Sequence, residues 1–143
     1  MDCPRSFTTR GLSMFPALLP RDEITLARAA AYETGDVVGF IGPGGEPVAH
    51  RVLGRCAATG EYLTAGDNNG GPDAPVPAGA LLGRVASVQR RLLGVSFAVP
   101  AGLWQRRLLP VALSRPLTRV VVQAVAVLMA LGLWRPRTVF IDK

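Results

Sequence analysis

Short segments in which hydrophobic and polar residues alternate, or in which hydrophobic residues run together, fill the chain between residues 11 and 89. Gly and Pro separate these segments, which is typical of β-strands joined by turns. The pattern predicts strands over residues 23–26, 36–41, 48–53, 61–64 and 81–88. The glycines of 42–45 predict a hairpin connection, and the glycines and prolines of 70–77 predict a loop that cannot be helical.

The last third of the chain has a different pattern. Residues 120–134, VVVQAVAVLMALGLW, carry no charge and no polar face, so a helix there would be buried in protein or in lipid. A helix that spans a bilayer needs about 20 residues, and this run reaches that length only if Arg119 and Arg135 extend to opposite interfaces. We expect a helical tail that associates with a membrane, with packing inside the protein as the alternative.

These patterns divide the chain into three parts. Residues 1–10 form an N-terminal arm, residues 11–89 a mainly β domain, and residues 90–143 an apolar, arginine-rich C-terminal segment. The arm, MDCPRSFTTR, has no apolar core. Neither a secretory signal peptide nor an N-terminal anchor is therefore expected. The predicted fold class is therefore mainly β, with a helical tail.

Composition and charge favour a membrane partner over nucleic acid. Hydrophobic residues make up 49% of the chain and charged residues 18%, and the net charge is +6. The arginines gather beside the apolar runs of the C-terminal half, as expected for a segment at an anionic lipid surface. Aromatic residues are only 6% and are not interleaved with the basic ones, so a surface that stacks nucleic-acid bases is not expected.

The chain lacks the residues that a metal centre or a disulfide framework needs. Its two cysteines, Cys3 and Cys56, form no Cys-x-x-Cys pair, and the single histidine cannot complete a zinc site with them. We expect two free thiols, with Cys56 in a loop or at a strand end. Neither a metal nor a cofactor is expected.

Three segments contribute residue types that can act together in acyl transfer: GLSMFP with Ser13, VAHRVLG with His50, and GDNNGGPD with Asp67 and Asp73. A serine hydroxyl needs a base within hydrogen-bond reach, and an imidazole can take its proton and return it to the leaving amine. A carboxylate on the other ring nitrogen fixes the tautomer. The alternatives are a histidine satisfied by a backbone partner and a GDNNGGPD segment that only forms turns.

These stretches resemble the conserved boxes of the type I signal peptidases. The Ser-Met-x-Pro within GLSMFP is similar to the nucleophile box of that family. Further stretches are similar to later boxes in the same order: GDVV at 35–38, HRV at 50–52, GDNN at 66–69 with Asp73 beyond it, and GRV at 83–85. The resemblance covers residues 11–88.

The resemblance implies an all-β serine endopeptidase that cleaves signal or leader peptides from precursor proteins after small residues. It implies Ser13 as the nucleophile, with its backbone N–H in the oxyanion hole, and His50 as the base. Histidine occupies this position in the archaeal and endoplasmic-reticulum branch, whereas the common bacterial branch has lysine. By its spacing Asp73 matches the catalytic acid, and Asp67 matches a second acid that organises the site or serves instead.

Two other functions compete with this hypothesis. One is a catalytically inactive β module that binds extended peptides by strand addition. The other is a self-cleaving repressor-type domain, which shares the Ser-Met motif but is expected to use lysine as its base. The leading prediction is a membrane-associated serine endopeptidase whose partners are precursor peptides and membrane lipid. The pattern leaves open which of Asp67 and Asp73 contacts His50 and on which side of the membrane the domain lies.

Overall fold

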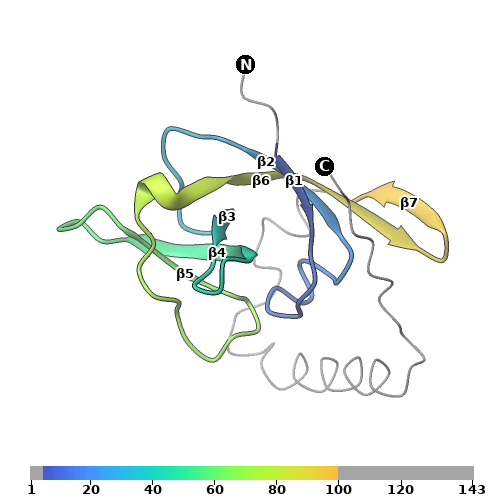
Figure 1. The fold of residues 1–143 in the computed structure, drawn as a ribbon, viewed down its shortest axis with the longest axis horizontal. Helices are drawn as coiled ribbons and strands as arrows, with labels where there is room; N and C mark the ends of the chain where they lie inside the picture. The colour runs from blue at the N-terminus through green and yellow to red at the C-terminus, as the bar shows by residue number, and fades with distance from the viewer. Residues whose placement is uncertain (1–4, 100–143) are drawn as a thin grey trace.

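The computed structural model describes residues 5–99, which form one antiparallel sheet (Figure 1). The prediction of a mainly β fold is therefore confirmed. The strands are β1 (Arg5–Thr8), β2 (Glu23–Ala27), β3 (Val37–Ile41), β4 (Pro47–Arg55), β5 (Tyr62–Ala65), β6 (Leu81–Leu92) and β7 (Val95–Ala98), with one short 3-10 turn, η1 (Ala78–Ala80), before β6. The predicted hairpin loop joins β3 to β4, where the N–H of Gly42 donates to the carbonyl of Glu46 at 2.7 Å.

The long strand β6 joins the two halves of the sheet. The strand order is β1-β2-β6-β3-β4-β5, so β6 lies between the β1–β2 pair and the β3–β4–β5 meander. Its start pairs with β3, its middle with β2, and its end with β7. Gln89 pairs with β2 and with β7, so these two strands lie on opposite edges of β6.

Two hydrophobic clusters form the core. The first packs the turn after β1 against β2 and β6: Met14, Ala17, Leu18, Ile24, Leu26, Val37, Val85, Val88 and Val99. The second packs the meander against the start of β6: Val38, Phe40, Val52, Tyr62, Val76 and Leu81. Neighbouring residues of β3, Val37 and Val38, belong to different clusters because successive side chains of a strand point to opposite faces.

The sheet extends past both predicted boundaries of the β domain. Four residues of the predicted N-terminal arm form β1, which pairs with β2 from Arg5 opposite Leu26. The predicted boundary after Gln89 falls inside β6, and β7 and the buried Val99 follow it. Hydrogen bonding to a neighbouring strand stabilises such short segments, and their own patterns do not reveal it.

The predicted helical run at 120–134 lies outside the described residues. Within residues 5–99, no helix is long and apolar enough to cross a membrane.

Candidate active site

The single histidine lies on the inner strand β4 with its ring buried. His50 pairs with Val38 of β3 and is only 7% exposed. Its ring and that of Phe40 are T-shaped, with ring centroids 6.0 Å apart. A buried imidazole needs hydrogen-bond partners for its nitrogens, and the structure supplies one for each.

The first partner is Ser13, in the turn between β1 and β2. Its Oγ lies 3.0 Å from Nε2 of His50, although the two residues are 37 positions apart. The turn is closed by a hydrogen bond from the N–H of Phe15 to the carbonyl of Leu12. Met14 is buried in the first hydrophobic cluster, and this burial anchors the turn beside β4.

The second partner is Asp73, in the loop after β5. Its Oδ2 lies 2.7 Å from Nδ1 of His50. Because a carboxylate only accepts hydrogen bonds, this contact places the ring proton on Nδ1. Nε2 is then the acceptor that faces the hydroxyl of Ser13, which is the tautomer that a general base requires.

The other candidate acid, Asp67, contacts Arg51 instead of His50. Nε and Nη2 of Arg51 donate to the two carboxylate oxygens of Asp67 at 2.7 and 2.6 Å. Nη1 of Arg51 also donates to the carbonyl of Gly35 at 2.7 Å. Because His50 and Arg51 are consecutive residues of β4, their side chains point to opposite faces of the sheet. The two acids therefore lie on opposite faces of β4, and Asp73 is the acid on the same face as His50.

The loop after β5 that carries both acids (residues 66–73, the acid loop) also contacts the backbone of the connection that carries Ser13 (residues 9–22). We call this connection the nucleophile turn, after the role that the sequence predicts for Ser13. The N–H of Asn68 donates to the carbonyl of Ser13 at 2.7 Å, and the Asn68 side chain donates to the carbonyl of Leu12 at 3.4 Å. A Cβ added to Gly66 would lie 2.8 Å from the carbonyl oxygen of Ser13. The acid loop and the nucleophile turn are thus packed backbone to backbone.

The backbone N–H of Ser13 is the group that the resemblance assigns to the oxyanion hole. Within residues 5–99 this N–H donates to no other protein group. A donor beside the nucleophile that has no internal acceptor can donate to a developing oxyanion.

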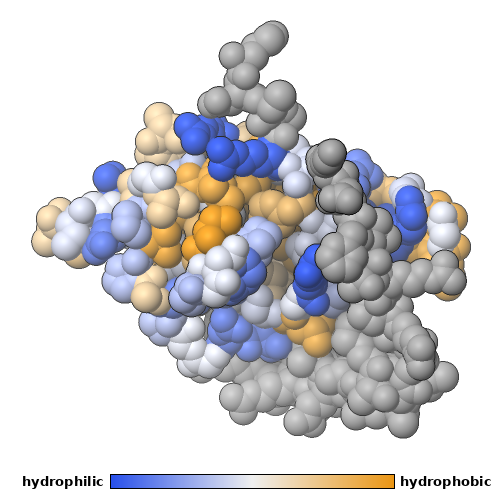
Figure 2. Space-filling model, viewed as in Figure 1, coloured by the Kyte–Doolittle hydropathy of each residue, from blue (hydrophilic) through white to orange (hydrophobic). Residues whose placement is uncertain are grey.

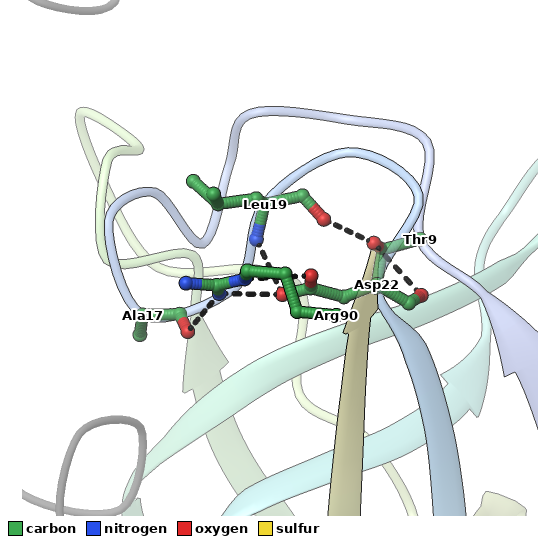
Figure 3. Close-up of polar contacts among 5 residues, drawn as sticks. All are labelled: Thr9, Ala17, Leu19, Asp22 and Arg90. Carbon is green, nitrogen blue, oxygen red and sulfur yellow. Dashed lines mark hydrogen bonds and ion pairs between the residues drawn. The ribbon is translucent and has the colours of Figure 1, made fainter. Parts of the chain in front are cut away.

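A buried ion pair fixes the far end of the nucleophile turn to β6 (Figure 3). Asp22 is 1% exposed, and its carboxylate accepts from Nε and Nη2 of Arg90 at 2.8 and 2.6 Å. The same carboxylate accepts from the N–H of Leu19 at 2.8 Å. The hydroxyl of Thr9 donates to the carbonyls of Leu19 and Asp22, which joins the two ends of the turn.

Cys56 is exposed and belongs to the turn that follows β4, as the sequence predicts. Its pKa is lowered because the Thr59 hydroxyl and the backbone N–H groups of Thr59 and Ala58 hydrogen-bond to its sulfur. Its own N–H donates to the carbonyl of Glu61, so its contacts are those of the turn. In the part of the chain that the structure describes, no group of three His, Cys, Asp or Glu side chains is arranged to hold a metal ion.

Three features of the site have no counterpart in the sequence patterns. The sequence gives no reason to expect that Thr64 contacts Asp73, that Arg51 is buried against Asp67, or that Asp22 pairs with Arg90. Asp22 follows Pro-Arg, a setting typical of an exposed loop, yet it is among the most buried polar residues. The paired residues are 9, 16 and 68 positions apart, and no pattern in the sequence marks any of the three pairs, so only the fold reveals them.

Comparisons of the chain with protein-family models, with curated proteins and with solved structures found no match.

Proposed function

We propose that this protein is a membrane-associated serine endopeptidase of the signal-peptidase type, which cleaves signal or leader peptides from precursor proteins. The observation that carries the proposal is the continuous hydrogen-bonded chain from Ser13 through His50 to Asp73, at 3.0 and 2.7 Å. A nucleophile, a base and an orienting carboxylate within such distances are the arrangement that serine acyl transfer requires.

Acylation begins when Oγ of Ser13 attacks the scissile carbonyl carbon while Nε2 of His50 takes the hydroxyl proton. The carbonyl oxygen becomes an oxyanion, which accepts a hydrogen bond from the N–H of Ser13. The imidazolium of His50 is stabilised by the Asp73 carboxylate at Nδ1.

The tetrahedral intermediate collapses when His50 gives its proton to the leaving amine and the C–N bond breaks. This leaves the leader as an ester on Ser13 and releases the mature polypeptide with a free amino group. A water molecule then attacks the ester while His50 takes a proton from it, and return of that proton to Oγ releases the leader as a carboxylic acid. The proton taken from Ser13 goes to the leaving amine and the proton taken from water restores the hydroxyl of Ser13, so the cycle balances without a cofactor.

The main competing function is a catalytically inactive β module that binds extended peptides. Strand addition needs a free sheet edge, and it needs no hydrogen bond between a serine and a histidine. The pairing of Ser13 with His50 therefore favours catalysis over this alternative.

Membrane association is the second part of the proposal. The β6–β7 hairpin projects from the sheet, and its large apolar side chains are exposed at Leu92, Leu93, Val95 and Phe97 (Figures 1 and 2). Leu93, at the tip, is 97% exposed. Exposed apolar residues gathered on a projecting element in a chain of net charge +6 suit an anionic lipid surface.

The test of the catalytic proposal is a cleavage assay with the full chain in detergent and a set of leader-bearing precursors, with products identified by mass spectrometry. We expect wild type to cut after small residues. Ser13→Ala, His50→Ala and Asp73→Asn should each lower the rate, by roughly a thousandfold or more for Ser13 and His50. Ser87→Ala, which changes an exposed serine of β6, is the matched control and should cut as wild type does.

Two outcomes would contradict the proposal. Cleavage that survives Ser13→Ala would show that another group is the nucleophile. If wild type cuts no precursor yet binds the same peptides, the inactive β module becomes the better description.

A further inference from the structure

Thr64 holds a buried hydroxyl against the catalytic carboxylate. It lies on β5 and is 0% exposed, and its Oγ1 donates to Oδ2 of Asp73 at 2.7 Å. This is the same oxygen that accepts from Nδ1 of His50. Because a carboxylate has no proton to give, the threonine hydroxyl is the donor in this contact.

The backbone attaches the acid loop to the same strand. The N–H of Asp73 donates to the carbonyl of Thr64 at 2.8 Å. Three residues further on, Val76 and Tyr62 exchange two backbone hydrogen bonds, each 2.8 Å long. The loop therefore returns along β5, and the position of the Asp73 backbone is fixed without the threonine side chain.

The orientation of the carboxylate needs a separate constraint. The last torsion of an aspartate side chain is broad, so a fixed backbone does not by itself determine where Oδ2 points. Thr64 pairs with Val52 of β4, and Val52 lies two residues from His50, so Thr64 and His50 lie on the same face of the sheet. The threonine hydroxyl is thereby placed beside the line from Asp73 to the imidazole.

We infer that Thr64 is a positioning residue of the proposed peptidase: its hydroxyl orients the Asp73 carboxylate so that Oδ2 faces Nδ1 of His50. This inference rests on the proposed function for its kinetic consequence, but its geometric content concerns only His50 and Asp73. Thr64 touches neither the nucleophile nor the scissile bond, and it acts through Asp73.

The test compares Thr64→Val, which keeps the side-chain shape and removes the hydroxyl, with Thr64→Ser, which keeps the hydroxyl. In the precursor assay we expect Thr64→Val to lower kcat by about ten- to a hundredfold with KM unchanged, as for other residues that support a catalytic group. Thr64→Ser should keep most of the wild-type kcat. Thr25→Val, which removes a strand threonine hydroxyl bonded to Ser6, is the control and should cleave at the wild-type rate.

A second readout needs no substrate. Because the chain has one histidine, the Nδ1–H proton of His50 gives a single ring signal in NMR spectra of histidine labelled with nitrogen-15. In wild type we expect the Nδ1–H proton to resonate at low field and to exchange slowly with water. In Thr64→Val the signal should move upfield and the proton should exchange faster. In Thr64→Ser the chemical shift and the exchange rate should be close to those of wild type.

The two readouts separate the inference from the proposed function. If wild type cleaves nothing but Thr64→Val changes the Nδ1–H signal, the positioning of His50 by Thr64 stands and the peptidase proposal fails. If Ser13→Ala abolishes cleavage but Thr64→Val changes neither kcat nor the Nδ1–H signal, the peptidase proposal stands and the inference about Thr64 is overturned.

Discussion

Gly66 lies where the acid loop passes closest to the nucleophile turn. A side chain at this position would meet the carbonyl oxygen of Ser13 at 2.8 Å and the side chain of Asn69 at 2.9 Å. The carbonyl belongs to the backbone and also accepts a hydrogen bond from Asn68, so it cannot yield without moving the nucleophile. No side chain fits at this position without a shift of the neighbouring atoms. The glycine therefore allows the close packing that leaves Ser13 at hydrogen-bond distance from His50.

Gly66→Ala should lower both stability and activity. Overpacking of this kind costs about 1–3 kcal/mol, and the displaced turn should slow cleavage further. Urea unfolding measures the first effect and the precursor assay the second. Gly70→Ala is the matched control in the same loop, because a Cβ there has open space around it. Equal stability and activity of the two variants would contradict the close packing at Gly66.

At this scale the sequence predicts the residues that carry recognisable chemistry and misses those that support them. Ser13 is marked by its Ser-Met-x-Pro setting and His50 by being the one histidine in the chain. Thr64 and Arg51 carry no such mark, because a threonine or arginine in a strand suits many roles. The choice between Asp67 and Asp73 depends on which face of β4 each acid reaches, and loop closure decides that.

At the scale of elements, the turn from β1 to β2 is held at both of its ends. Burial of Met14 fixes the part next to the nucleophile, and the Asp22–Arg90 pair fixes the end that enters β2 (Figure 3). The pair also joins this turn to β6, 68 residues away in sequence.

Short strands such as β1 and β7 are not predicted by the sequence pattern for a related reason. Their partner strands stabilise them, and those partners lie elsewhere in the chain.

Breaking this pair should destabilise the fold. Removing one member of a buried ion pair leaves the other without its partner, and such changes cost about 3–5 kcal/mol. We expect Asp22→Ala to lower the free energy of unfolding in urea by about 3 kcal/mol. Glu23→Ala, at the exposed neighbouring position, is the control. The double variant Asp22→Leu with Arg90→Met should recover much of the loss, and a loss below about 1 kcal/mol in Asp22→Ala would contradict this role for the pair.

At the scale of the whole molecule, the nucleophile turn and the residue that follows the apolar hairpin contribute to one hydrophobic cluster. Val99 follows directly on β7 and packs in the same hydrophobic cluster as Met14, the residue after the nucleophile. Under the proposed function, a hairpin in contact with lipid would bring the domain that carries Ser13 to the membrane surface. The proposed substrates carry apolar leaders, so this arrangement would bring the cleavage site and the nucleophile to the same surface.

Vesicle cosedimentation tests this arrangement with the full chain. We expect binding to vesicles that contain anionic lipid, weakened by salt because screening reduces the attraction of the +6 charge. The double variant Leu93→Asp with Val95→Asp should lower the bound fraction by about tenfold or more, since each buried side chain contributes roughly 1.5–3 kcal/mol. Ile41→Asp, at an exposed apolar residue of β3, is the control. Unchanged binding by the hairpin variant would exclude the hairpin as a lipid contact.

The central place of β6 also has a consequence for biosynthesis. In the order of the sheet β6 separates β2, next to the nucleophile turn, from β3 and β4, which carry the base. During translation these two groups of strands leave the ribosome before β6 does. The sheet that links these two groups is thus complete only after residues 81–92 have emerged. Under the proposed function, a growing chain would therefore lack the complete scaffold for cleavage until this late strand is inserted.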